Sequence, residues 1–507
     1  METVGAILNS PLQAVASAVI FGAVFLFIFE ILSIKFPRYR KPPGPTPLPF
    51  IGNSLLLARA PFKTFAQMRE KYGDISLVYI GRTPTVVLSG FSVIKEALVQ
   101  AGVEFAGRPT IPVLDWIVHG LGIVMAPYGL SWKQQRRFSL TTLRNFGLGK
   151  KSLEDRVSEE ALFLVRELEK QGGKPINPQF TVYNAVSNII CSVVFGSRFE
   201  YDDEDFRHLL HIINRNVQLV SSLTAQVFNL VPFIKHLPGP HQQIRRNSIE
   251  VMAFIGKLYR EHKETFDPEN LRDFLDAYIL EMDKQKSNPE STFFEENLFM
   301  TIADLFLAGT DTTATTLRWG LLYMSQYPEV QERCHQEIAR EVGYDRTPSL
   351  NDKDRLPYVE ATIREIQRVG NIVPMGVPRQ VTKDTKLRGY TLPKGTQVFC
   401  NLSSVLNDKD HWKFPDQFNP ENFLDDQGRF CKRESFIPFG TGLRVCPGEQ
   451  LARLELFVYF SVLLQRLEFI WPDGSGTPDL AGSFGLLRNP LPFQVICQSR
   501  DRAGQAK

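Results

Sequence analysis

The sequence predicts a mainly α-helical domain with a small β portion, preceded by one N-terminal transmembrane helix. Apolar residues recur at three- and four-residue spacing through most of the chain after residue 60, which is the helical period. Short runs with β-strand character are few. The chain has 507 residues, whereas a single core usually stops growing at roughly 250–300 residues. We therefore expect two domains, or one large fold built around something that fills its centre.

The N-terminal segment is strongly apolar. From Ala14 to Ile34 the only charged residue is Glu30, and the run is long enough to cross a bilayer as a helix. No Lys or Arg precedes the run, and four basic residues follow it at once: Lys35, Arg38, Arg40 and Lys41. The positive-inside rule then places the rest of the chain in the cytosol. A cleaved signal peptide is the alternative, but its basic start and small-residue cleavage site are missing.

A proline-rich stretch follows, with prolines at positions 42, 43, 45, 47 and 49. Prolines this dense cannot form a helix, so we expect a stiff, extended spacer. No internal repeat, low-complexity tract or second linker is visible. The predicted organisation is a membrane anchor at 1–34, a basic and proline-rich linker at 35–59, and one domain at 60–507.

Periodicity places the elements of this domain. The helical period is clearest at 153–170, 181–196, 246–264, 269–285, 293–325, 328–341 and 357–369, and β signals occur at 75–89, 386–399 and 491–498. The stretches 109–125 and 205–245 are expected to be loops. Within the second, 217–237 is apolar but too interrupted to span a membrane; it either packs in the core or makes a shallow membrane contact.

Composition and cysteine usage exclude several classes of protein. The chain is 43% hydrophobic and 22% charged with a net charge of +3, so nucleic acid is not an expected partner. Its six cysteines are scattered without a CxxC pair, which argues against a disulfide framework or a structural zinc site. A reducing compartment is the expected setting.

The strongest motif is the ten-residue run FGTGLRVCPG at 439–448. Its glycines allow a tight loop, and Arg444 supplies positive charge. The segment after Gly448 has helical spacing, so Cys446 precedes a helix N-terminus, where free N–H groups favour a thiolate. Phe439 can shield the sulfur from water. This combination suits a metal-bound thiolate, whereas a lone cysteine is usually a buried small hydrophobe, our interpretation of the other five.

The run resembles the signature FxxGxRxCxG of the cytochrome P450 superfamily and matches it at every fixed position. The resemblance implies the cytochrome P450 fold, with haem b (iron protoporphyrin IX) as cofactor and Cys446 as the axial thiolate ligand of the haem iron. Segments such as REIQR, GYTLPKGTQVF and FNPENFLDDQGRF resemble the animal microsomal family 2 enzymes. By that resemblance the chain is a monooxygenase of the endoplasmic reticulum membrane whose catalytic domain faces the cytosol.

A second motif, AGTDTT at 308–313, lies within a long apolar helix. Glycine and clustered threonines weaken a helix, so we expect a local distortion that opens a groove. Ala308 and Thr312 are four residues apart and share a face, with Asp311 on the flank. An acid beside an alcohol can relay protons, and the motif resembles the family's oxygen-activating segment. The alternative is a solvated threonine-rich patch, which the surrounding apolar residues disfavour.

Further residues take their roles from the resemblance. Glu365 and Arg368, an ExxR pair, are expected to form a buried structural ion pair, with Asn422 standing where a third partner is often arginine. The residues expected to contact haem, including its propionates, are Trp132, Arg136, Arg108, Arg379, Arg444, Phe439 and Ala308. The substrate pocket is expected to include Val124, Met125, Leu307, Val373, Val377 and Leu486, all of them apolar.

The expected reaction inserts one oxygen atom from O₂ into a lipophilic xenobiotic, steroid or unsaturated fatty acid. No GxGxxG motif follows a strand, so electrons must reach the chain from NADPH through another protein. We expect NADPH–cytochrome P450 reductase, with cytochrome b5 as a second candidate, to dock on a basic patch at Lys133, Arg137, Arg144, Lys150 and Lys151. A haem-thiolate isomerase or peroxygenase, and a non-catalytic haem carrier or sensor, are alternatives that the Asp311–Thr312 pair disfavours.

Overall fold

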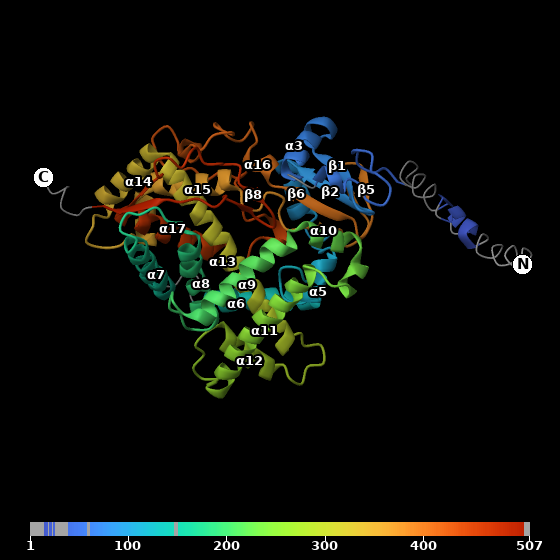
Figure 1. Cartoon of the computed structure of the whole chain (residues 1–507), viewed down its shortest axis with the longest axis horizontal. Coiled ribbons are helices and arrows are strands. Elements are labelled where there is room, and N and C mark those ends of the chain that lie inside the picture. Colours follow the sequence, from blue (N-terminus) through green and yellow to red (C-terminus); the bar gives the residue numbers. More distant parts are fainter. Residues whose placement is uncertain are drawn as a thin grey trace, which may run out of the picture.

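Long helices form most of the molecule, and a smaller sheet region lies at one end beside α3 (Pro61–Tyr72) (Figure 1). The computed structural model describes residues 15–18, 20–22, 24–25, 39–57, 61–146 and 151–500. Most of the predicted anchor at 14–34, part of the predicted linker, and Lys150 lie outside these residues. Among the residues described, no helix combines the length and the apolar character needed to cross a bilayer.

The main sheet has four strands in the order β1-β2-β6-β3. Strand β1 (Ile75–Ile80) pairs antiparallel with β2 (Thr83–Ser89), which accounts for the β signal at 75–89. Strand β2 runs parallel to β6 (Gln397–Asn401), and β6 pairs antiparallel with β3 (Arg379–Gln380). The sheet therefore joins segments that lie about 300 residues apart in the chain, and it carries Arg379 at its edge.

The remaining strands form three two-stranded pairs. They are β4 (Thr385–Leu387) with β5 (Tyr390–Leu392), β8 (Ser483–Phe484) with β9 (Arg488–Asn489), and β7 (Leu467–Ile470) with β10 (Ile496–Ser499). The predicted β segment at 386–399 therefore contains parts of three strands, β4, β5 and β6. Strand β10 begins later than the expected residue 491, because Pro490 and Pro492 have no N–H to donate to a neighbouring strand.

The helices with clear periodicity lie where the sequence predicts them, within a few residues at each end. They are α7 (Lys151–Glu169), α8 (Gln179–Val194), α11 (His241–Glu264), α12 (Phe274–Lys284), α13 (Glu295–Gln326), α14 (Pro328–Glu341) and α15 (Pro357–Gly370). Helix α13 passes through the centre of the molecule (Figure 1) and is buried along most of its second half. It contacts α8, α11, α15 and α17 (Glu449–Arg466), so residues on α13 can reach several layers of the core.

The stretch 205–245 corrects the prediction of a loop. It contains α9 (Glu204–Val220), α10 (Leu223–Leu230) and the short 3-10 helix η2 (Pro232–His236). The N-cap side chains Asp203 and Ser222 accept hydrogen bonds from the first turns of α9 and α10. The apolar residues of 217–237 do not all enter the core, because several of them line one side of these helices and stay exposed.

The other helical segments are α2 (Ser54–Leu57), α4 (Phe91–Lys95), η1 (Glu96–Gln100), α5 (Pro112–Val118), α6 (Leu130–Asn145), η3 (Leu350–Arg355), α16 (Ser403–Leu406), η4 (Pro420–Phe423) and η5 (Gly442–Arg444). Segment 109–125 is therefore helical in its first half, at α5. The two largest apolar clusters among the described residues are one formed by α7, α8, α13, α15 and α17, and a smaller one that packs the main sheet against α4 and η1.

Candidate active site

The loop that carries Cys446 is closed by its own backbone. The amide of Cys446 donates to the carbonyl of Phe439 at 3.0 Å, and α17 begins at Glu449. Gly442 has a φ of 76°, and a Cβ on it would lie 1.8 Å from the carbonyl oxygen of Leu98. Only glycine fits this approach, so the loop is held against η1.

The surroundings of Cys446 act on its thiol in opposite directions. Burial raises the pKa of Cys446, while a hydrogen bond from the Gly448 amide and the charge of Arg136 lower it. Arg136 is held beside the sulfur because it donates from Nη2 to the carbonyl of Val445 at 2.5 Å. A metal ion displaces the thiol proton on binding, so this is a suitable position for a thiolate ligand.

Four arginines converge beside this loop from segments far apart in the chain. Arg108, Arg379 and Arg444 are each less than 10% exposed, and they lie close enough to Arg136 to repel one another. Burial, together with the charges of Arg379 and Arg136, lowers the pKa of Arg444 to about 9. Among the residues that the structure describes, no carboxylate forms an ion pair with any of the four.

Trp132 completes this cluster. Its ring lies 3.9 Å from the Arg444 guanidinium, and its indole N–H is buried without a hydrogen-bond partner. Buried donors are nearly always paired, and buried cations need anions. A cofactor with two carboxylates would supply both, so the residues fit the haem propionates that the sequence motifs imply. Arg444 also donates to the carbonyls of Ala106, Ile123 and Ala126.

The 308–313 motif lies on helix α13. Ala308 is exposed and Thr312, one turn later, is partly exposed, although most of the second half of α13 is buried. The hydroxyl of Thr312 donates to the carbonyl of Ala308 at 2.7 Å. The expected distortion is absent: α13 is continuous from Glu295 to Gln326. The Gly309 side of the helix instead packs against Ile190 of α8.

Asp311 is 6% exposed, and burial raises its pKa to about 7, opposed by the charge of Arg318. A carboxyl group with this pKa can both accept and give a proton near neutral pH. The acid and the alcohol of Thr312 are adjacent on α13. The arrangement is chemically able to relay protons toward the face that Ala308 and Thr312 expose.

An apolar cavity of about 150 Å³ lies between α5, α9, α11 and α13. Leu307 and Leu486, two of the residues predicted for the substrate pocket, line this cavity. Val124, Met125, Val373 and Val377 are partly or largely exposed but do not belong to this lining. Among the described residues of the lining, Asp304 is the only one with a charge.

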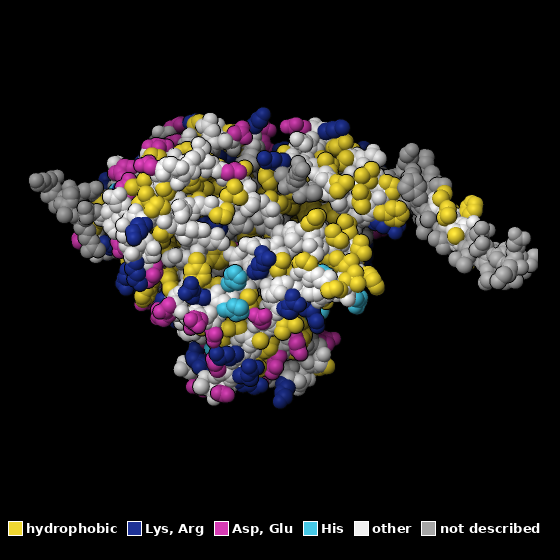
Figure 2. All heavy atoms as spheres, viewed as in Figure 1, with side chains coloured by type: hydrophobic (Ala, Val, Ile, Leu, Met, Phe, Trp, Pro, Cys, Tyr) yellow, Lys and Arg dark blue, Asp and Glu magenta, His cyan; other side chains and the backbone are white. Residues whose placement is uncertain are grey.

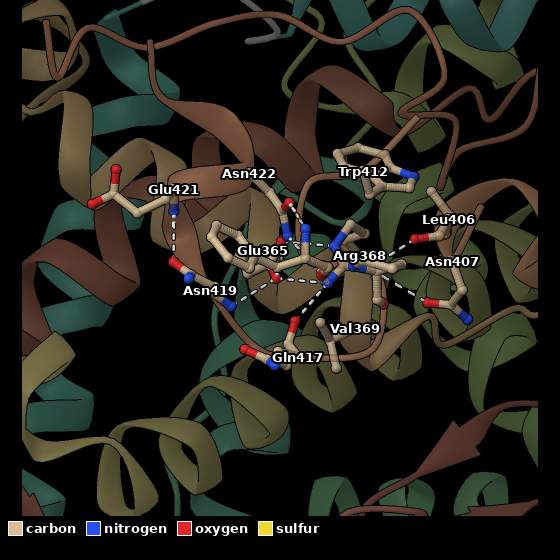
Figure 3. Close-up of polar contacts among 12 residues, drawn as sticks. Glu365, Arg368, Val369, Leu406, Asn407, Trp412, Gln417, Asn419, Glu421 and Asn422 are labelled. Atoms are coloured by element: carbon tan, nitrogen blue, oxygen red, sulfur yellow. Dashed lines mark hydrogen bonds and ion pairs between the residues drawn. The ribbon is translucent and has the colours of Figure 1, made fainter. Parts of the chain in front are cut away.

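Glu365 and Arg368 form a fully buried ion pair (Figure 3), with both nitrogen–oxygen distances at 2.7 Å. Asn422 takes the third place: its Nδ2 donates to Glu365 Oε1 at 3.1 Å, and its Oδ1 accepts from the Phe414 amide. Arg368 also donates to the carbonyls of Leu406, Phe414, Pro415 and Gln417. The pair therefore fastens the segment 406–422 to α15.

Sequence reasoning missed Asp304. Its Oδ2 accepts hydrogen bonds from the amides of Ile123 and Val124 at 2.7 and 2.9 Å. An available signal was its position: an acid in an apolar helix, seven residues before Asp311 and therefore on the same side of α13.

The comparisons with known proteins agree with this geometry. The family model described as "Cytochrome P450" matches residues 42–497. The chain is similar to cytochrome P450 2B4 of Oryctolagus cuniculus, with 48% identity over 85% of this chain and 88% of the relative. It is also similar to cytochrome P450 2B19 of Mus musculus (46% identity; 90% and 94% covered) and cytochrome P450 2J2 of Homo sapiens (46%; 89% and 89%).

The chain belongs to the cytochrome P450 family. It is a haem-thiolate monooxygenase with haem b as its cofactor, and its electrons come from NADPH through a reductase. The isomerase, peroxygenase and carrier alternatives are not favoured. When bound, haem activates O₂ so that one oxygen atom can enter a substrate; the roles of individual side chains in that reaction are proposed below.

Proposed function

We propose that the chain oxygenates lipophilic molecules, such as xenobiotics, steroids or unsaturated fatty acids, by hydroxylation or epoxidation. The observation that carries this proposal is the apolar cavity beside α13, which adjoins the helix face that exposes Ala308 and Thr312. Burial of apolar surface is the main force by which such a cavity binds a ligand. Leu307, which lines the cavity and precedes Ala308 in the chain, limits the size of the substrate.

Around the cofactor, we assign Cys446 as the axial ligand and Phe439 as the cover of its sulfur. Trp132, Arg136, Arg108 and Arg379 hold the propionates, with Arg444 stacked on Trp132. Thr312 and Asp311 hold and pass protons at the Ala308 face. The buried carboxyl of Asp311 is supported in this role by its raised pKa, and Thr312 by its hydroxyl on the exposed face.

Carbon monoxide added to the reduced holoenzyme should give the strongly red-shifted Soret band of thiolate ligation, and Cys446→His should abolish that band.

Thr312→Ala should divert NADPH oxidation into hydrogen peroxide and lower the yield of product per NADPH by about tenfold. Thr316→Ala is the matched control, because Thr316 makes the same type of bond to the carbonyl of Thr312 one turn later. Equal coupling in both variants would remove the relay role from Thr312.

We further propose that residues 1–34 anchor the chain in the endoplasmic reticulum membrane, that 35–59 are a linker, and that 60–507 form the catalytic domain on the cytosolic side. A second, shallow membrane contact is supported by exposed apolar residues over α10 and η2 (Figure 2), such as Leu223 and Phe233 at 79% and 71% exposure. Leu230 of α10 lies against Gly81, next to Gly52 of the linker segment. The exposed apolar side of α10 and η2 and the linker segment around Gly52 can therefore contact the same membrane surface.

Replacement of both Leu223 and Phe233 by Ser should weaken binding of the full chain to phosphatidylcholine vesicles. Leu491→Ser, at an exposed leucine elsewhere in the chain, is the control. If the anchor alone holds the chain on vesicles, neither change will alter the bound fraction, and the second contact is refuted.

We propose that NADPH–cytochrome P450 reductase docks on the basic side of α6, with cytochrome b5 as a second candidate for the same surface. Lys133, Arg137 and Arg144 are exposed there, and Arg136 of the same helix contacts the Cys446 loop. Leu443 of that loop is 42% exposed, so the surface combines charge with an apolar contact.

Charge reversal at Lys133 and Arg137 should slow reductase-driven turnover and spare peroxide-driven turnover. Lys257→Glu on α11 is the control, and equal loss in both assays would refute docking there.

A further inference from the structure

A groove of about 560 Å³ lies between the start of α8 and the middle and end of α9. It is separate from the apolar cavity beside α13, because no described residue lines both. Its lining includes Gln179, Phe180 and Tyr183 of α8 and His211, Asn214 and Arg215 of α9, and none of the described lining residues is acidic. A groove of this volume can hold a drug-sized molecule, and the site described above makes no use of it.

The α9 side of the groove carries positive charge whose contacts are with neutral groups. Arg215 Nη1 donates to Gln218 Oε1 at 3.4 Å, and Arg207, two turns before Arg215, lies over the ring of Phe180 at 5.1 Å from its centre. One long contact with a neutral amide leaves most of the five N–H groups of Arg215 available to a ligand. The groove therefore favours an anion whose oxygens can accept charge-assisted hydrogen bonds.

The α8 side supplies a ring surface and further donors. Phe180 is 39% exposed, and Tyr183 is 6% exposed although it lines the groove. In the part of the chain that the structure describes, the Tyr183 hydroxyl makes no hydrogen bond, whereas buried hydroxyls nearly always have a partner. The first turn of α8 contains no acidic residue, so the positive end of the helix is not compensated there. An anion that carries a planar ring matches this side.

Helix α9 lies between the groove and the apolar cavity. Leu209, Ile213 and Val217 line the cavity, whereas His211 and Arg215 line the groove. With 3.6 residues per turn, these two sets occupy opposite sides of the helix. A molecule that contacts both α8 and α9 in the groove would hold α9 in place, and a second ligand in the cavity would then have less ordering to impose.

We propose that the groove between α8 and α9 is an effector site for planar organic anions, such as aromatic or steroidal carboxylates and sulfate esters. The anionic group binds Arg215 and the Tyr183 hydroxyl, and the ring packs on Phe180. Occupation of the groove increases the affinity of the cavity for its ligand, because it fixes α9. The inference goes beyond the proposed function and rests on it only for the assignment of the cavity as the substrate site.

Three variants test this inference. Arg215→Gln removes the charge and retains a polar side chain, and Tyr183→Phe removes only the hydroxyl. Arg246→Gln on α11 is the matched control. Arg246 is also exposed and also donates to a glutamine three residues away, Gln243, but it does not line the groove.

The direct readout is equilibrium dialysis of the full-length holoenzyme against 1-naphthyl sulfate, with the cavity blocked by saturating 4-phenylimidazole. The dissociation constant of the sulfate should rise about tenfold in Arg215→Gln and about threefold in Tyr183→Phe, because charge-assisted hydrogen bonds are lost. It should stay unchanged in Arg246→Gln. The carbon monoxide spectrum of each variant verifies that the thiolate-ligated holoenzyme has formed.

The readout for the effector role is the dissociation constant of 4-phenylimidazole, measured from its absorbance shift at increasing concentrations of 1-naphthyl sulfate. In the unmodified chain and in Arg246→Gln this constant should fall by about fivefold and then level off. In Arg215→Gln the same sulfate concentrations should leave it unchanged. The neutral 1-naphthol, which has the same ring without the charge, should not lower it.

Unchanged affinity for 1-naphthyl sulfate in Arg215→Gln would overturn the proposal. A rise of the 4-phenylimidazole constant with sulfate concentration would also overturn it, since the anion would then compete within the cavity. So would a constant that does not change in the unmodified chain, or an equal fall in both arginine variants. Neither readout requires product formation, so a failure to oxygenate lipophilic molecules would refute the proposed function without altering these results.

Discussion

Arg368 joins three separate stretches of the chain through one side chain. It pairs with Glu365 of its own helix, and its remaining N–H groups meet carbonyls in 406–417. Asn422, the expected third partner, donates to Glu365 through its amide and brings no second cation. A neutral amide in this position leaves one cation for one acid, so the buried group carries no net charge.

Arg368→Ala should destabilise the fold by about 3–5 kcal/mol, because Glu365 would remain buried without its cation. Arg333→Ala is the control: Arg333 pairs with Glu421 of the neighbouring η4, but both side chains are more than 40% exposed, and the expected cost is about 0–1 kcal/mol. Urea unfolding of the two variants checks the difference. Similar costs would contradict the structural role of the buried pair.

At the scale of elements, the position of α13 depends on its close packing against α8. A Cβ on Gly309 would lie 2.4 Å from Cδ1 of Ile190. Glycine is therefore needed for packing, and the motif 308–313 forms a continuous helix instead of the distorted groove that its composition suggests. Helix–helix contact outweighs the weak intrinsic helix propensity of glycine and threonine.

Gly309→Ala should destabilise the protein by about 1–3 kcal/mol through overpacking, although alanine in a free helix would be favourable by about 1 kcal/mol. Ile190→Ala removes the two atoms that clash, so the double variant should be more stable than the sum of the single changes predicts. Thermal unfolding of the four proteins measures this coupling. Strict additivity would show that the two helices do not meet at this pair.

At the scale of the whole molecule, the buried His335 and the half-buried His262 act oppositely on the pH dependence of stability. Burial and the charge of Arg500 lower the pKa of His335, whose ring lies between the carbonyl of Leu464 and the hydroxyl of Tyr344. Burial also acts to lower the pKa of His262, but its hydrogen bond with Asp273 outweighs this and raises it. The fold therefore favours the neutral form of His335 and the protonated form of His262.

As pH falls below about 6.5, the unfolded chain binds a proton at His335 that the folded chain does not, so stability falls, by at most about 1.4 kcal/mol per pH unit. His262 contributes stability below about 6.5 that is lost as pH rises through its higher folded pKa. His335→Gln should remove the first dependence and His262→Gln the second. Urea midpoints between about pH 5 and pH 8 check both slopes; a shared slope in the two variants would contradict the assignment.

The sequence by itself determined the parts of this protein that depend on local pattern. The Cys446 loop, the Glu365–Arg368 pair and the long periodic helices follow from residue types at short spacing, because a tight loop or one helix face is set by neighbours in the chain. Family membership follows from the same motifs.

Tertiary structure decided what depends on contacts between distant segments. Arg108, Trp132, Arg379 and Arg444 converge only because the sheet and α6 bring together segments far apart in the chain. The helices of 205–245, the continuity of α13 and the hold of Asp304 on the loop at 122–126 likewise depend on packing partners. A sequence pattern indicates which residues share one face of a helix or strand, but it does not indicate which other segment packs against that face. The direction of each side chain is settled only when the chain packs.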